Sequence, residues 1–252
     1  MSLLKKTKKA LSLLLAALLL LTALSAGSVC FAAARGQCGP EMYWVLDNNG
    51  LLRITGSGRM TDAQTWPDQA AAIKSVQFDC VPENIGAGSF ESCVNLKSIT
   101  IPDGVKRIGI QAFRDCTALE SITLPDSIET ISNKVFSGCT ALKSVKIPAK
   151  LTTVEVQLFE NCTSLESVTL PAGISAIGFG AFRGCSALKD VYFGGTRAQW
   201  NAVDKEEDNA ALQTATVHCS DDNSIANKPF FSRVIDAIRR VFERLFGWLI
   251  RR

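Results

Sequence analysis

Apolar and polar positions in the middle of the chain follow one pattern that recurs every 23 residues. Each unit reads C-x-x-L-x-x-(I/V)-x-φ-P, where φ is apolar; the unit that starts at Cys93 runs through Leu96, Ile99 and Ile101 to Pro102. Apolar residues that alternate with polar ones before a proline are typical of a short β-strand with one buried face. Proline then ends the strand, because it has no N–H to donate to a neighbour. The pattern predicts one short strand in each unit.

Two columns of identical residues mark the repeat. The cysteine column holds Cys93, Cys116, Cys139, Cys162 and Cys185. The phenylalanine column, in the second half of each unit, holds Phe90, Phe113, Phe136, Phe159 and Phe182. One unit cannot bury its own apolar face, whereas stacked units share a continuous core. The sequence therefore predicts a leucine-rich-repeat solenoid of six stacked parallel strands, with the phenylalanines inside.

The repeats resemble the BspA-like leucine-rich repeat, whose unit reads L-x-x-I-x-L-P-x-x-V-x-x-I-G-x-x-A-F-x-x-C. Residues 96–116 match this unit at every signature position, with Ile101 in a leucine column. The third unit departs from it, with Glu155 in the glycine column and Leu158 in the alanine column. The resemblance implies a secreted or surface-displayed bacterial protein of a kind assigned to adhesion or host-protein binding, and it supplies no ligand.

The segments around the repeats complete the expected organisation. Residues 38–58 look like the N-terminal hairpin that precedes such repeats, and residues 191–218 look like their closing module. We predict five segments: 1–34, a signal peptide; 35–69, an N-terminal β-hairpin cap; 70–203, the leucine-rich repeats; 204–224, a closing module and linker; and 225–252, an amphipathic basic helix.

The first 34 residues have the layout of an export signal. Four lysines with no acidic residue precede an uncharged run over residues 10–34, which ends in Ala32, Ala33 and Ala34. Small residues at that point favour cleavage near Ala34 and Arg35. The alternative is an uncleaved anchor, because the uncharged run is long enough to span a bilayer. Both alternatives place the protein outside the cytoplasm, either secreted or at the cell surface.

The last 28 residues predict an amphipathic helix with a broad apolar arc and a net charge of +5. The residues expected to contact an anionic membrane surface are Phe231, Phe242, Phe246, Trp248, Arg240 and Arg244. Aromatic residues flanked by arginines are typical of a helix that lies in the headgroup plane. The alternative is that the same apolar face folds back and caps the last repeat.

Charge and composition exclude several classes of function. The total of +3 hides an acidic body, since residues 35–224 carry a net −6, and a general nucleic-acid binder needs basic charge across its body. His218 is the only histidine, so no acid–base pair, nucleophile elbow or zinc-binding spacing is present in the sequence. We expect no catalytic residues, no cofactor and no metal site.

The polar strand positions decide whether the sheet is a binding surface. The residues of the candidate binding face are Lys97, Thr100, Glu120, Thr123, Lys143, Lys146, Glu166, Thr169, Lys189 and Tyr192. Solenoids commonly bind through such extended faces, and Tyr192 alone is too few aromatics for a sugar, so a protein or peptide ligand is favoured. The alternative is that the face binds nothing: charges one repeat apart neutralise one another, and the hydroxyl groups hydrogen-bond to one another or to water.

The cysteines admit two roles. In the repeat column, cysteine behaves as a small buried apolar residue, so we expect free, buried thiols there. Cys38, Cys80 and Cys219 lie outside the column, and Cys38 with Cys80 is the expected disulfide pair, since an even number of cysteines in an exported chain favours pairing.

The sequence thus predicts an exported, non-enzymatic binding or adhesion module that uses its solenoid to contact an extracellular protein or peptide. Two other classes stay open: a structural protein of the cell envelope, and a scaffold domain of an enzyme system.

Overall fold

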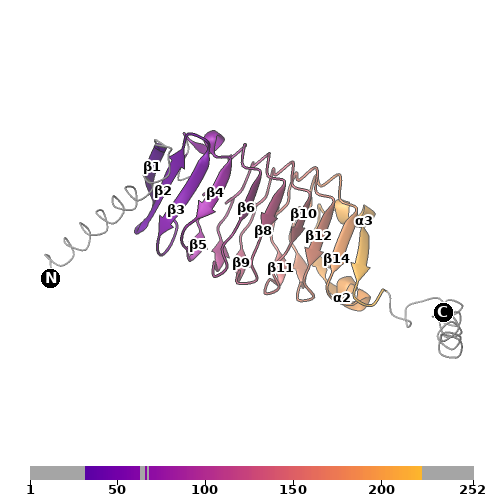
Figure 1. Cartoon of the computed structure of the whole chain (residues 1–252). Helices are drawn as coiled ribbons and strands as arrows, with labels where there is room; N and C mark the ends of the chain where they lie inside the picture. The colour runs from indigo at the N-terminus through magenta and orange to yellow at the C-terminus, as the bar shows by residue number, and fades with distance from the viewer. Residues whose placement is uncertain (1–31, 63–65, 67, 223–252) are drawn as a thin grey trace, which may run out of the picture.

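The computed structural model of the chain describes residues 32–62, 66 and 68–222. The repeats stack in a single, nearly straight row, with the two ends of the described chain at opposite ends of the row (Figure 1). Most of the expected signal segment and the whole of the expected C-terminal helix lie outside the described residues. Strand β1 begins at Ala32, so cleavage near Ala34 falls within it.

One long side of the row, called here the front face, is a series of parallel strands, one from each turn. The strands of the described residues are β4 (Ser75–Phe78), β6 (Ser98–Thr100), β8 (Ser121–Thr123), β10 (Ser144–Lys146), β12 (Ser167–Leu170), β14 (Asp190–Phe193) and β16 (Thr216–Cys219). The first six are the expected ones. The closing module adds the seventh, because β16 pairs in parallel with β14. These strands are hydrogen-bonded in three groups, which contain β4, β6 with β8, and β10 to β16.

The return path of each turn forms a second row of strands, called here the back face. These strands are β5 (Asn84–Ile85), β7 (Arg107–Ile108), β9 (Thr130–Ile131), β11 (Thr153–Val154), β13 (Ala176–Ile177) and β15 (Asp204–Lys205). They pair in parallel with the next turn in two groups, β5 to β9 and β11 to β15, as Ile108 does with Ile131. Each is only two residues long; in β7 and β9 one buried isoleucine follows one exposed polar residue, whereas both residues of β15 are exposed.

The N-terminal cap is a three-stranded meander rather than a two-stranded hairpin. Strands β1 (Ala32–Gly39), β2 (Met42–Asp47) and β3 (Leu51–Gly56) are antiparallel, and β3 then pairs in parallel with β4. Between β2 and β3, Gly50 adopts a φ of +89°, which glycine reaches without a steric penalty. A short 3-10 helix, η2 (Ala70–Ala72), leads into the first repeat strand.

The phenylalanine column runs through the core, as expected. Its five rings, Phe90 to Phe182, are completely buried, and the four neighbouring centroid pairs lie 5.1–5.8 Å apart with nearly parallel planes. Trp66 packs on Phe90 at 5.0 Å and extends this stack into the cap. Burial of a ring of this size stabilises the fold by roughly 1.5–3 kcal/mol.

The turn around each phenylalanine has two residues with positive φ. The first column, with φ of 54–62°, holds Gly88, Gln111, Lys134, Gln157 and Gly180. The second column, with φ of 57–78°, holds Ser92, Asp115, Gly138, Asn161 and Gly184. The third unit keeps this turn despite Glu155 and Leu158, and Leu158 is buried in the core. The departure from the repeat pattern is therefore absorbed without a change of fold.

The repeat cysteines form a buried ladder of free thiols, as the column position predicts. The thiol of Cys139 donates to the carbonyl oxygen of Phe113 at 3.1 Å, and Cys116, Cys162 and Cys185 make the same contact one turn along. Burial raises the pKa of the Cys139, Cys162 and Cys185 thiols, for Cys185 to about 12, and a hydrogen bond with Cys93, followed by burial, raises the pKa of Cys116.

The expected disulfide between Cys38 and Cys80 is wrong for this structure, which holds both as free thiols. Cys38 is completely buried, and the Cys80 thiol is directed to the carbonyl oxygen of Ile54 at 3.6 Å. That contact directs the Cys80 thiol toward β3, while burial, and then the nearby Cys80, raises the pKa of the Cys38 thiol to about 12.

The closing module is built around two short helices, α2 (Arg197–Ala202) and α3 (Ala211–Thr214). The Thr196 side chain caps α2 by accepting from the N–H of Gln199, whose side chain bonds back to the Thr196 N–H. Trp200 packs against Phe193 at 5.4 Å and covers the last turn of the core.

Candidate binding surface

All ten residues of the candidate binding face lie exposed on the front face, in or directly before strands β6 to β14. Their neighbours Ile99, Val145, Val168 and Val191 point into the core, so the alternation of the strand separates the two sets. The strand of each turn is hydrogen-bonded to the next or stacked beside it, which holds the columns in line along the row (Figure 1).

Charges on this face pair between neighbouring turns. Lys143 Nζ lies 3.6 Å from Glu120 Oε2, and Lys189 Nζ lies 3.8 Å from Glu166 Oε2, with all four side chains more than half exposed. Exposed pairs of this kind contribute only about 0–1 kcal/mol each. Within the described part of the chain, Lys97 and Lys146 make no ion pair. The face is therefore only partly neutralised, and its charges are available to a partner.

The C-terminal end of the front face carries a cluster that the sequence did not reveal. Tyr192 stacks on His218 with ring centroids 4.8 Å apart, and His218 Nε2 lies 2.7 Å from Asp190 Oδ1. Strand β16 brings His218 into register with Tyr192. The cluster presents an aromatic surface beside a carboxylate, which suits contact with a planar or cationic side chain.

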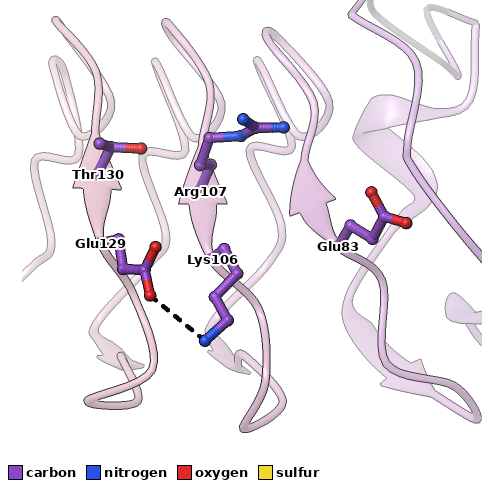
Figure 2. A pocket seen from close by; sticks show the side chains of 5 residues that line it. All are labelled: Glu83, Lys106, Arg107, Glu129 and Thr130. Atoms are coloured by element: carbon purple, nitrogen blue, oxygen red, sulfur yellow. Dashed lines mark hydrogen bonds and ion pairs between the residues drawn. The ribbon is translucent and has the colours of Figure 1, made fainter.

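The back face has a shallow polar pocket of about 460 Å³, lined by Glu83, Lys106, Arg107, Glu129 and Thr130 (Figure 2). Glu129 Oε1 lies 3.0 Å from Lys150 Nζ and 3.4 Å from Lys106 Nζ. Hydrogen bonds and charge from these two lysines lower the pKa of the Glu129 carboxyl. The Glu129 carboxylate is therefore paired with the two lysines. The residues that line the pocket offer polar contacts to a ligand but include no nucleophile–base pair.

A second feature that sequence reasoning missed is the cluster of Cys219, Asp221 and Asp222, whose ligand atoms lie within 4.8 Å of one another. Asp222 accepts hydrogen bonds from the Arg197 guanidinium at 2.7 Å and from the N–H of Cys219 at 2.6 Å. The Cys219 N–H and then Arg197 lower the pKa of Asp222. These bonds tie α2 to β16, so the cluster has a clear structural role.

The predicted membrane contact concerns residues that lie outside the described part of the chain. In the part of the chain that the structure describes, no helix has the length and hydropathy needed to cross a bilayer. The candidate membrane-contact residues Phe231, Phe242, Phe246, Trp248, Arg240 and Arg244 all lie outside the described residues.

Similar solved structures are bacterial repeat proteins. A leucine-rich repeat protein from Eubacterium ventriosum is 24% identical with a TM-score of 0.57, over 64% of this chain and 44% of that one. A leucine rich cell surface protein from Faecalibacterium prausnitzii is 26% identical with a TM-score of 0.50, over 77% of this chain and 55% of that one. The chain thus spans about half the length of these relatives.

The family comparison agrees with the repeat seen in the structure. No curated protein is significantly similar to the chain. The model of the BspA type leucine rich repeat region matches residues 83–202 in six copies, which cover the turns from β5 to α2. Residues 83–202 therefore belong to the BspA-type leucine-rich repeat family.

Proposed function

We propose that the protein is an exported, non-enzymatic adhesion module that binds an extracellular protein or peptide through its front face. The observation that carries this proposal is the set of ten exposed polar side chains that recur in columns along the parallel strands of the front face. Extended faces of stacked repeats suit long contacts with another chain. The cell-surface relative from F. prausnitzii supports display outside the cell.

The proposal includes attachment to an anionic membrane surface through residues 225–252. Their net charge of +5 favours anionic lipid, and the aromatic residues among them suit the headgroup region. The repeats would then be held at the surface that binds this segment.

A binding experiment with matched variants tests the role of the front face. The full chain is measured against a panel of immobilised extracellular matrix and secreted host proteins. Thr123→Arg with Thr169→Arg places two large cations on the front face, whereas Thr130→Arg with Thr152→Arg does the same on the opposite side of the turns. We expect the front-face variant to bind a panel protein at least about tenfold more weakly, which is about 1.4 kcal/mol, and the control to bind as the parent does.

Two results contradict the proposal. Equal binding by all three proteins places the contact elsewhere, and no binding to any panel member favours a structural protein of the envelope. Turnover of a substrate in a broad hydrolase screen of the parent chain favours the third class, a scaffold domain of an enzyme system.

A further inference from the structure

From β6 to β14 the charged column of the front face alternates in sign, whereas Lys74, one turn earlier, has the same sign as Lys97. The alternating part holds Lys97, Glu120, Lys143, Glu166 and Lys189, one from each turn of β6 to β14. The order of charges is the same from either end. Two copies of this column can therefore be placed face to face with their turns in opposite order. If the copies are offset by an odd number of turns, each lysine within the overlap then lies opposite a glutamate.

A twofold axis that lies in the plane of the interface and parallel to the strands produces that arrangement. Such an axis reverses the order of the turns and places each column opposite the same column of the second copy. With the axis between β10 and β12, Lys143 lies opposite Glu166 of the second copy and Glu120 lies opposite Lys189 of the second copy. An axis that passes through a strand instead brings lysine to lysine and glutamate to glutamate.

The two other columns of polar residues on the front face are compatible with the same axis. Lys146 meets Thr169 of the second copy, Thr123 meets Tyr192, and Asp190 meets Ser121, so no like charges face one another. The neighbouring odd offset, with the axis between β8 and β10, brings Lys74 opposite Lys189 of the second copy and is disfavoured for that reason. An axis between β12 and β14 brings only Glu166 opposite Lys189 of the second copy, which is half as many opposite-charge pairs. The axis between β10 and β12 is therefore the one that the charges favour.

The pairs already formed within the chain compete only weakly with this arrangement. Their N–O distances of 3.6 and 3.8 Å are long, and the side chains are more than half exposed, so they can exchange partners at little cost. The row is nearly straight in Figure 1, which lets two front faces approach along their length. A face only three or four residues wide is smaller than the roughly 800 Å² per partner of a stable complex, so one pair is weak and many displayed copies are needed.

We propose that a partner of the front face is a second copy of this chain, held face to face by the alternating charges about an axis between β10 and β12. This inference rests on the proposed binding role of the same face and names its partner. Where two surfaces both display the protein, such contacts between copies produce homotypic adhesion.

Charge variants of the full chain test the inference by sedimentation equilibrium in density-matched non-ionic detergent. Glu120→Lys with Glu166→Lys makes an all-lysine column; Lys97→Glu with Lys143→Glu and Lys189→Glu makes an all-glutamate column. We expect each variant alone to self-associate at least about tenfold more weakly than the parent. We expect the equimolar mixture to associate again, and association of the parent to weaken between low and high salt.

Two further proteins keep the test decisive if a variant misfolds. The variant with all five charges inverted restores the alternation and should self-associate as the parent does. Lys106→Glu with Lys150→Glu changes the back face and should have no effect. Association that is unchanged in both single-sign variants, or a mixture that does not recover, overturns the inference. A monomeric parent that still binds a panel protein through the front face overturns it as well, but leaves the proposed function standing.

Discussion

The side-chain oxygen of Asn209 accepts a hydrogen bond from the backbone N–H of Phe182 at 2.9 Å. In the preceding turn the equivalent N–H, of Phe159, donates instead to the backbone carbonyl of Ala181 at 2.8 Å. Asn209 thus supplies the acceptor that a further repeat would provide. Its Nδ2 also donates to the carbonyl of Gly178 at 3.0 Å, which fixes the side chain in place. In the last phenylalanine turn, Phe182 bonds to a side-chain amide, while the N–H of Gly180 donates to the backbone carbonyl of Glu207 at 3.0 Å.

Replacement of that amide tests its role. Asn209→Ala leaves the buried N–H of Phe182 without an acceptor, and we expect the free energy of unfolding to fall by about 1–3 kcal/mol. Urea denaturation followed by circular dichroism measures the change. Gln213→Ala alters an exposed position of the nearby α3 and should change the free energy of unfolding by less than about 0.5 kcal/mol; equal stability of both variants contradicts the role given to Asn209.

The phenylalanine stack makes a second prediction. Phe136 lies between Phe113 and Phe159, at 5.8 and 5.5 Å, and is completely buried. Phe136→Ala opens a cavity in the middle of the row and should lower the free energy of unfolding by about 3–5 kcal/mol. Thr130→Ala, at an exposed position of the same turn, should change it by less than about 0.5 kcal/mol. A loss below about 1 kcal/mol in the first variant would show that the row collapses around the gap.

The buried thiols predict a loss of stability at alkaline pH. Burial raises the pKa of Cys185 to about 12, above its value in the unfolded chain, so the folded state binds more protons. The stabilisation is complete below about pH 8.5 and is lost as the pH rises toward the folded pKa. Cys185 alone contributes a slope of at most about 1.4 kcal/mol per pH unit.

Denaturation in a reducing buffer at several pH values between neutral and strongly alkaline measures that slope. Cys185→Ala should reduce the slope, whereas Ser186→Ala at the exposed neighbour should not. The same burial predicts that Cys116, Cys139 and Cys162 react with an alkylating reagent only after denaturation. Rapid labelling of the native protein, or bridges between neighbouring ladder cysteines, contradicts this account.

Processing of the N-terminus is a separate prediction. The three alanines before Arg35 favour cleavage there, and the shortened β1 would still pair with β2 from Arg35 onward. We expect intact-mass measurement of secreted material to give a mature chain that begins near Arg35. A mass that retains residues 10–34 makes the protein membrane-anchored instead.

Residues 225–252 can be tested against vesicles. We expect removal of this segment to abolish binding to vesicles that contain anionic lipid, and we expect high salt to weaken binding of the intact protein, since charge attraction is screened. Thermal melts distinguish the alternative. If truncation leaves vesicle binding intact and clearly lowers the melting temperature, the segment caps the solenoid.

The repeated part of the fold was predictable because one period describes it. At 23 residues per turn, every column falls in register, so the inward phenylalanines, the free cysteines and the exposed columns follow from spacing alone. The turn that carries Glu155 also keeps its shape, because bonds from the turns on either side hold it, as in the N–H of Gln157 donating to Phe179 O at 3.0 Å.

The last turn was not predictable by the same means. Tyr192 and His218 are in register although 26 residues separate them, and Phe182 bonds Asn209 across 27 residues, so neither contact obeys the period. The Cys80 thiol illustrates a second limit. Its direction toward Ile54 depends on the chain path after β4, which no residue pattern encodes.

The two ends of the described residues lie at opposite ends of the row, and this placement has a mechanical consequence (Figure 1). A load between them acts along the row and across the strands, so it separates neighbouring strands by peeling rather than by shear. Each 23-residue turn that peels releases roughly 80 Å of extended chain while the remaining turns stay folded. A protein tethered at one end and gripped at the other would therefore lengthen stepwise, and dissipate the load before its contacts break.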